Sequence, residues 1–328
     1  MEATRREFLS AGGATALSGC VGSAVSRDVE DVKYIDIHAH CTEDPLPPMS
    51  GLGQPLCCPE QLIAHYDRLG IEKGCILGLG TPENFIGGMS NESILRLAAA
   101  YPDRFIPFCV VDPRACGNTP FANLRDVLMH YRDRGCKGVG EVCAQIHLLD
   151  PRMQNLFKAC EEVGFSLTFH MSPISGWSYG VIDENGLPEL EICLQRFPKL
   201  RFFGHSCAFW SEISTCSTIQ GRNARGKGPV KEEGAIQRLM RKYPNLYGDL
   251  SAGSGAYALM RDPAYAAKFL TEFQDRLMFG MDICSPEGER RNPNRLSGFL
   301  RDMLAKGDIT EAVFDKVVRG NAARILGV

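Results

Sequence analysis

Short apolar runs rich in β-branched residues alternate with longer amphipathic segments from residue 33 onward. The short runs predict eight strands, at residues 33–37, 73–79, 105–111, 136–142, 166–170, 200–204, 246–250 and 276–281. The amphipathic segments predict helices at residues 59–69, 90–101, 120–134, 151–163, 187–197, 232–243, 263–273 and 293–306, and one more at 310–326. Many of these helices begin at or near proline, which suits the first helical turn.

The order of these elements indicates the fold class. Strict alternation of strand and helix implies parallel strands with crossover helices, and eight such units favour a closed barrel over an open, doubly wound sheet. The 328 residues are 44% hydrophobic and 23% charged, and barrels of this length commonly form one domain. We therefore expect an α/β fold, a single (β/α)8 TIM barrel over residues 28–328 with an additional C-terminal helix.

Charge and hydropathy argue against two kinds of partner. The net charge of −3 and the pI of about 6.2 give no basic field for nucleic acid. The chain contains no stretch of about 20 apolar residues that would form a membrane-spanning helix. We expect a small-molecule substrate and no nucleic-acid partner. The sequence leaves open whether the chain forms a homo-oligomer.

The first residues differ in character from the rest. Residues 4–9, Thr-Arg-Arg-Glu-Phe-Leu, form a twin-arginine pattern, and residues 17–20, Leu-Ser-Gly-Cys, resemble a bacterial lipobox. We expect residues 1–27 to be a signal segment and linker, with export in a bacterium by the twin-arginine route. A lipid anchor on Cys20 would be the only membrane contact. A frayed basic tail is the alternative, and the protein is cytoplasmic if the signal is not used.

The 14 cysteines are many for an exported protein. Without Cys20 their number is odd, so they cannot all pair within the chain, and no CxxC motif occurs. Several lie in apolar, strand-like runs, where a thiol behaves as a small hydrophobe. The twin-arginine route reconciles export with free thiols, because it moves proteins that have already folded in a reducing cytoplasm.

Candidate metal ligands lie at the ends of predicted strands. His38 and His40 end the first strand two residues apart, so their imidazoles project from one face. His170 ends the fifth strand, His205 the sixth and Asp282 the eighth. In a barrel these strand ends converge on the face where active sites are built. Imidazoles and one carboxylate suit Zn²⁺ while leaving a position open for water.

These strand-end motifs resemble those of the amidohydrolase superfamily, in particular its amidohydrolase-related branch, over nearly the whole chain from Tyr34 onward. That branch includes metal-dependent hydrolases and decarboxylases of the aminocarboxymuconate-semialdehyde type. The resemblance implies four metal ligands: His38, His40, His170 and Asp282. It also implies that His205 either binds a second metal or orients substrate and water.

The expected cofactor is a divalent cation, with Zn²⁺ the first choice and Mn²⁺ or Fe²⁺ left open, as one or two ions. The cation lowers the pKa of its water toward about 7 and polarises a substrate carbonyl. Asp282 can take the water proton and pass it to the leaving group. His205 can stabilise the developing oxyanion.

The fourth strand offers two further candidates. Many members of the superfamily bridge two metals with a lysine on this strand, and some with a glutamate. Here Lys137 lies near the start of the strand and Glu141 near its top, about 13 Å apart along the chain. We favour Glu141 as a metal ligand or bridge. An equal alternative is that Glu141 does not bind the metal and instead orients one of the ligand histidines.

Substrate contacts are expected from the loops after strands five and six. Residues 220–229 form a glycine-rich, basic loop with Arg222, Arg225 and Lys227, which would suit an anionic substrate. Trp177 and Trp210 could wall the pocket. A solvated loop and tryptophans packed beneath loops are the alternatives. Asp249, which ends strand seven, is expected to order its surroundings rather than touch substrate.

These residues predict a metal-dependent hydrolase that cleaves a C–N or C–O bond in an amide, lactone or ester of a small, anionic molecule. A metal-dependent nonoxidative decarboxylase on the same scaffold is the alternative, because both chemistries use nearly the same ligands. A non-enzymatic lipoprotein that binds metal or a small ligand is a weaker third hypothesis. Barrel loops set specificity independently of the scaffold, so the sequence does not identify the substrate.

Overall fold

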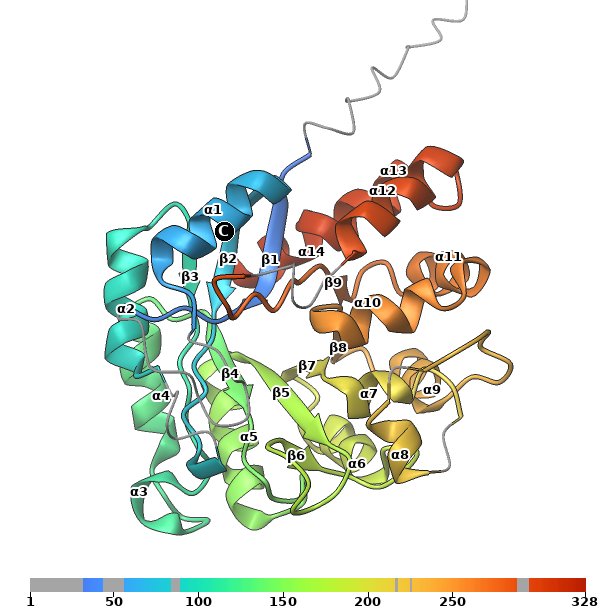
Figure 1. Cartoon of the computed structure of the whole chain (residues 1–328). Coiled ribbons are helices and arrows are strands. Elements are labelled where there is room, and N and C mark those ends of the chain that lie inside the picture. Colours follow the sequence, from blue (N-terminus) through green and yellow to red (C-terminus); the bar gives the residue numbers. More distant parts are fainter. Residues whose placement is uncertain (1–31, 44–55, 84–88, 216–217, 225, 288–294) are drawn as a thin grey trace, which may run out of the picture.

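The computed structural model describes residues 32–43, 56–83, 89–215, 218–224, 226–287 and 295–328 (Figure 1). The twin-arginine pattern and Cys20 lie outside these described residues. Within them, no helix is both long and apolar enough to cross a membrane.

Eight parallel strands form the centre of the molecule, as the alternating pattern predicts. They pair in two series, β1-β2-β3 and β4-β5-β7-β8-β9. The strands are β1 (Tyr34–Ala39), β2 (Ile71–Ile76), β3 (Phe105–Pro107), β4 (Gly138–Val142), β5 (Ser166–Ser172), β7 (Arg201–His205), β8 (Leu246–Asp249) and β9 (Leu277–Met278). A two-residue strand, β6 (Val181–Ile182), pairs with the end of β5 in the loop that follows it.

Two isolated bridges join the series into a closed barrel. Cys109, just after β3, pairs in parallel with Val139 of β4, and its amide donates to Gly138 O at 3.0 Å. On the other side, Ala39 of β1 pairs in parallel with Ile283, which follows β9. The prediction of a (β/α)8 barrel is confirmed.

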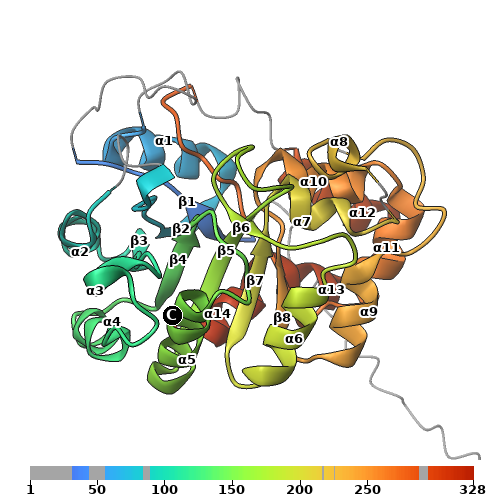
Figure 2. The ribbon, with the colours of Figure 1, turned by 90° about the horizontal axis from the view of Figure 1, so that it is seen from below.

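Helices surround the strands (Figure 2). The eight predicted crossover helices are all present: α1 (Pro59–Leu69), α2 (Asn91–Ala100), α4 (Leu124–Asp133), α5 (Pro151–Val163), α6 (Pro188–Arg196), α9 (Ala235–Lys242), α11 (Pro263–Glu272) and α12 (Leu296–Lys306). Four of them begin at a proline, whose missing N–H would be unpaired in the first turn in any case. The α5 cap is typical, because the Asp150 carboxylate accepts from Arg152 N at 2.9 Å.

Several short elements were not predicted: α3 (Ala115–Asn118), α7 (Cys207–Ser211), α8 (Ile219–Arg222) and α10 (Ala252–Met260). Except for α3, they lie in loops that follow β7 and β8. The predicted last helix is present, but it is divided into α13 (Glu311–Asp315), a π-helical turn (Lys316–Gly320) and α14 (Asn321–Leu326). The helices α3, α7 and α8 have only four or five residues, too few to carry a readable periodicity, and α10 consists almost entirely of small and apolar residues, so no polar face marks it.

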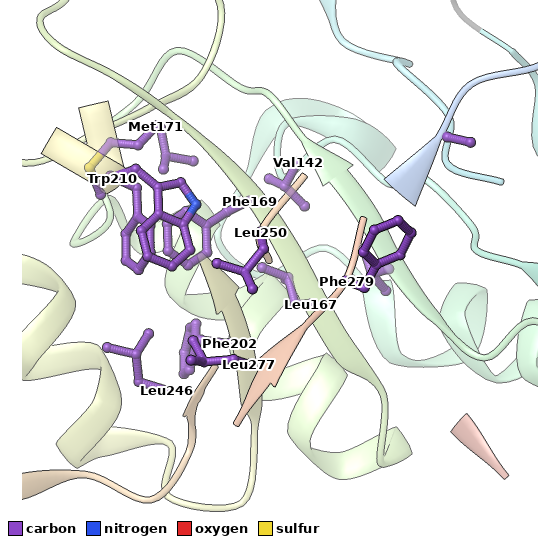
Figure 3. Packing of buried hydrophobic residues seen from close by; sticks show 14 of the residues in the cluster. Val142, Leu167, Phe169, Met171, Phe202, Trp210, Leu246, Leu250, Leu277 and Phe279 are labelled. Carbon is purple, nitrogen blue, oxygen red and sulfur yellow. The ribbon is translucent and has the colours of Figure 1, made fainter. Parts of the chain in front are cut away.

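Two hydrophobic layers hold the barrel together. The larger lies between strands and helices and includes Leu167, Phe169 and Phe202, all fully buried (Figure 3). The smaller fills the barrel interior, where Ile35 of β1 belongs to one cluster with Leu326 of α14. The C-terminal helix therefore packs against the interior residues, and the carboxyl ends of the strands are left for the polar side chains.

Candidate metal centre

The carboxyl ends of five barrel strands bring six candidate ligand side chains together, as the sequence led us to expect. These are His38 and His40 from β1, Glu141 from β4, His170 from β5, His205 from β7, and Asp282 just after β9. All but His170 and Asp282 are almost fully buried, and these two keep about a fifth of their side-chain surface exposed (18% and 22%). The open side of the centre therefore lies toward His170 and Asp282.

Hydrogen bonds orient the two histidines of β1 so that their Nε2 atoms can bind a cation. The Nδ1 atom of His38 donates to Asp249 Oδ2 at 2.7 Å, and that of His40 donates to Leu77 O at 2.9 Å. Both acceptors lack a proton, so each ring carries a hydrogen on Nδ1, and Nε2 is the nitrogen that can bind a cation. The two Nε2 atoms face each other at 3.2 Å. A cation bound by both Nε2 atoms would take the place of a shared proton, so these residues fit a divalent cation.

Carboxylate oxygens complete this group of donors. Glu141 Oε2 lies 3.6 Å from His38 Nε2 and 3.5 Å from His40 Nε2. Asp282 Oδ1 lies 3.5 Å from His40 Nε2 and 4.0 Å from His38 Nε2. Ligands about 2.1 Å from a tetrahedral Zn²⁺ are separated by roughly 3.4 Å. The observed separations are close to that value.

The second oxygen of Glu141 faces a different pair of histidines. Glu141 Oε1 lies 2.6 Å from His170 Nδ1 and 3.6 Å from His205 Nε2. The other nitrogen of His205, Nδ1, lies 2.9 Å from Ser251 Oγ and 3.5 Å from Asp249 Oδ2. The Glu141 carboxylate therefore lies between two histidine pairs, whereas Lys137, the other candidate on this strand, is exposed.

Burial and charge act in opposite directions on the ionisation of this centre. Burial lowers the pKa of His38, but Asp249 and Glu141 outweigh burial and hold that pKa well above its usual range. Burial likewise raises the pKa of Glu141, yet His170 and His38 hold it well below its usual range. The pKa of His170 is lowered, chiefly by burial, so its imidazole is neutral at pH 7 and donates to Glu141. The centre thus contains ionised carboxylates that need positive charge nearby.

Asp249 supports the centre from below, as the sequence analysis expected. It is fully buried, and its Oδ1 accepts from Ser251 N at 3.0 Å while its Oδ2 holds His38. The indole of Trp210 donates to Asp249 O at 2.8 Å. Burial excludes a direct contact between Asp249 and substrate.

Asp36 holds the end of β1 in place. Its Oδ1 accepts from the amides of His38 and Met281, at 3.0 and 2.9 Å, and its Oδ2 accepts from Tyr66 OH at 2.9 Å. It thereby ties the first strand to the segment that leads to Asp282. Its burial raises the pKa of this carboxyl to about 7.

Two residues near the centre were missed by the sequence analysis. Cys143 lies two residues beyond Glu141, is fully buried, and forms one donor group with Glu141 and His170. The Tyr179 ring packs on the His170 ring with centroids 4.5 Å apart. Gly180 permits this approach, since its φ is +121° and a Cβ there would lie 2.8 Å from His170 O. The alternation of residues along β4 could have indicated Cys143, but no local signal marks Tyr179.

The basic loop after β7 is placed differently from the prediction. Arg222 is buried, and its Nη1 donates to Pro173 O at 2.9 Å and to Asp183 O at 2.8 Å. Its guanidinium is therefore occupied by carbonyl oxygens of the loop after β5. Lys227 is exposed and lines a surface pocket of about 260 Å³ with Arg261, and Arg225 lies outside the described residues.

The two tryptophans also differ in their surroundings. Trp210 is 2% exposed and packs beneath Asp249, so packing under a loop describes it better than a pocket wall. Trp177 is 52% exposed in the loop after β5, two residues before Tyr179. Its position in this loop leaves it available for a substrate contact.

Several solved structures are similar to this chain along most of its length. An uncharacterised TIM-barrel protein from Bordetella bronchiseptica has a TM-score of 0.56 at 19% identity, covering 90% of this chain and 99% of the other. A probable 2-pyrone-4,6-dicarboxylic acid hydrolase from Acinetobacter baumannii, with citric acid bound, has a TM-score of 0.54 at 14% identity and the same coverage. A 5-carboxyvanillate decarboxylase from Novosphingobium aromaticivorans, complexed with manganese, has a TM-score of 0.53 at 16% identity, covering 90% and 96%.

At these identities the structures show the shared fold. No curated protein matches the chain in sequence. The model of the amidohydrolase family, however, matches residues 35–328, which is nearly all of the barrel and includes the six candidate ligands. The chain therefore belongs to the amidohydrolase family of enzymes.

Proposed function

We propose that this enzyme hydrolyses a C–N or C–O bond, in an amide, lactone or ester, of a small anionic molecule, with two divalent cations as cofactor. The observation that carries the proposal is the division of the Glu141 carboxylate between two histidine pairs. Its Oε2 faces His38 and His40, and its Oε1 faces His170 and His205. A carboxylate in this position suits a bridge between two cations, which is the arrangement that favours hydrolysis.

The proposed ligands fall into two sets that share Glu141. One set adds His38, His40 and Asp282, and the other adds His170 and His205. When bound, the cations polarise a substrate carbonyl and make a nearby water more acidic. The imidazole and carboxylate donors suit Zn²⁺, and Mn²⁺ is compatible with the same oxygen ligands.

Asp282 is the residue we assign to proton transfer. Its carboxylate is the most exposed of the six side chains at the centre, with 22% of its surface accessible, so it can reach an attacking water. It takes the proton of that water and passes it to the leaving nitrogen or oxygen. Its φ of +55° is unusual for a residue with a side chain, and the hydrogen bond from its amide to His38 O, at 2.8 Å, holds it there.

His205 is better placed as a ligand than as a donor to an oxyanion. Its Nδ1 lies next to the Asp249 carboxylate and the Ser251 hydroxyl. A proton on Nδ1 leaves the lone pair of Nε2 directed toward Glu141. Of the two roles that the resemblance allowed, the geometry supports the second-cation ligand.

The test is the metal content per chain, by elemental analysis of the wild type and of Glu141→Gln. We expect two ions in the wild type and one in the variant, because an amide bridges two cations far less well than a carboxylate. Glu233→Gln is the matched control, since Glu233 is exposed and paired with Arg241. One ion in both wild type and Glu141→Gln would contradict the two-cation site.

Product analysis separates hydrolysis from decarboxylation. Lactones and esters of small carboxylic acids should release protons in a weakly buffered assay, and amides should release ammonia or an amine, whereas hydroxybenzoates should release no CO2. Release of CO2 without hydrolysis would support the decarboxylase alternative. The similarity to the 5-carboxyvanillate decarboxylase is the reason for testing it.

A further inference from the structure

We infer that the Cys143 thiolate is a ligand of the cation on the His170 side of the centre. This inference rests on the two-cation site proposed above and adds a sulfur donor to it. The sequence analysis treated the cysteines as small hydrophobes and assigned none of them to the metal.

The position of Cys143 carries the inference. A sulfur of Cys143, a carboxylate oxygen of Glu141 and a ring nitrogen of His170 all lie within 4.8 Å of one another. The three residues come from two neighbouring strands, since β4 pairs with β5 and Cys143 directly follows β4. Glu141 and Cys143 are two residues apart, so an extended chain directs both side chains to one side.

The surroundings hold this cysteine at the centre. Cys143 is fully buried, and its carbonyl oxygen accepts from Gly180 N at 2.7 Å. That hydrogen bond ties the end of β4 to the loop that places Tyr179 over His170. This backbone contact therefore helps to hold the thiol against Glu141 and His170.

A thiolate at this position would add negative charge for the cation and would favour the softer metal ions. In the metal-free chain a proton lies between His170 Nδ1 and Glu141 Oε1, which are 2.6 Å apart. A cation bound to His170 Nδ1 would require the other neutral tautomer, with the ring hydrogen on Nε2, and the Cys143 thiol would release its proton to solvent as the sulfur coordinates. A thiolate favours Zn²⁺ and Co²⁺ over Mn²⁺ and Mg²⁺, so this position should prefer the softer ions.

The experiment is a Co²⁺ titration of the full chain after metal removal, followed by absorption spectroscopy. We expect two equivalents to bind, and one of them to produce the near-ultraviolet charge-transfer band of a cobalt thiolate. In Cys143→Ala this band should disappear, and the affinity for one equivalent should fall by at least about tenfold. The preference of that equivalent for Zn²⁺ over Mn²⁺ should fall with it.

Cys160→Ala is the matched control, because Cys160 is also fully buried but lies on α5 and belongs to no donor group among the described residues. It should keep the band. If Cys143→Ala fails to fold, Cys143→Ser replaces it, and thermal unfolding of the metal-free forms establishes that the variants are folded.

The outcomes separate the two proposals. Two equivalents with no thiolate band, or a band that survives in Cys143→Ala, would overturn the inference and leave the two-cation site standing. A single equivalent whose band depends on Cys143 would support the sulfur ligand and contradict the two-cation site.

Discussion

At the scale of single residues, the candidate metal centre depends on groups outside the proposed set of ligands. Asp249 is the clearest case: it is fully buried, it fixes the tautomer of His38 through a 2.7 Å hydrogen bond, and it lies 3.5 Å from His205 Nδ1. One carboxylate therefore orients a histidine on each side of the centre. Partners of this kind typically change metal affinity by about 10- to 100-fold.

Asp249→Asn should lower the affinity for Zn²⁺ by about 10- to 100-fold while the fold is retained, because the amide holds the His38 ring less firmly and no longer balances its charge. Competition with a chromogenic chelator measures the change. Asp150→Asn, which alters the cap of α5 and the ion pair of Asp150 with Arg152, both outside the centre, is the control. Equal affinities in wild type and Asp249→Asn would show that the hydrogen bond does not orient the ligand.

Asp183, a buried carboxyl outside the candidate metal centre, should make the stability of the fold depend on pH. Burial raises the pKa of Asp183 from 3.8 to about 6, although its oxygens accept from Leu190 N and Glu189 N. The folded chain thus holds this proton more tightly than the unfolded chain. Stability from this group is complete below about pH 4 and is lost as the pH rises to about 6.

Asp183→Asn should remove this dependence. We expect the wild type to lose of the order of 2–3 kcal/mol relative to the variant between pH 4 and pH 7. Urea unfolding of the metal-free chains at several pH values measures the difference, and the subtraction cancels every group that the two chains share. Parallel stability curves would contradict the assignment.

At the scale of elements, the loop after β5 is held by a residue from the loop after β7. The Arg222 guanidinium bonds to Pro173 O and Asp183 O, at the two ends of the segment that carries Trp177 and Tyr179. Glu212 lies 3.6 Å from its Nε and supplies the opposite charge. The planar fork of donors makes these contacts together, which a lysine cannot do.

Arg222→Lys should therefore loosen this segment. We expect a loss of about 1–3 kcal/mol in the free energy of unfolding and faster proteolysis within residues 173–183, with metal content unchanged. Arg238→Lys, on the exposed surface, is the control. Unaltered stability and protease resistance, with a weaker apparent affinity for an anionic substrate, would instead support the substrate-binding role expected from the sequence.

At the scale of the whole molecule, the barrel separates stability from chemistry. Its interior is filled by apolar side chains that pack with α14, and its polar centre lies where the strands end. This division is usual for barrels of this kind. From their sequence, we propose that the first 27 residues export and anchor the domain.

Cys20→Ala tests that proposal in a bacterial host. The wild type should fractionate with membranes and be released by detergent, whereas the variant should be soluble after export because it has no lipid. Cys116→Ala, which alters an exposed thiol in the barrel, is the control. Membrane association that is the same in the wild type and both variants would rule out the lipobox.

The barrel could be predicted from the sequence because its information is local and repeated. Each strand and helix carries its own periodicity, and the chain repeats the unit eight times, so small errors at the ends of elements do not change the fold. The same regularity places His38, His40, His170, His205 and Asp282 at the tops of strands. Residues at the ends of parallel strands meet in any closed barrel.

Contacts between distant segments were decided only by the tertiary structure. Glu141 lies between two histidine pairs, Cys143 and Tyr179 lie against His170, and Arg222 is buried against the loop after β5. Each of these contacts joins residues from different loops or strands. A local pattern records which face of its own element a residue occupies, but not which groups lie opposite. Those neighbours, and with them the chemistry of the centre, are set by how the barrel closes and how its loops pack.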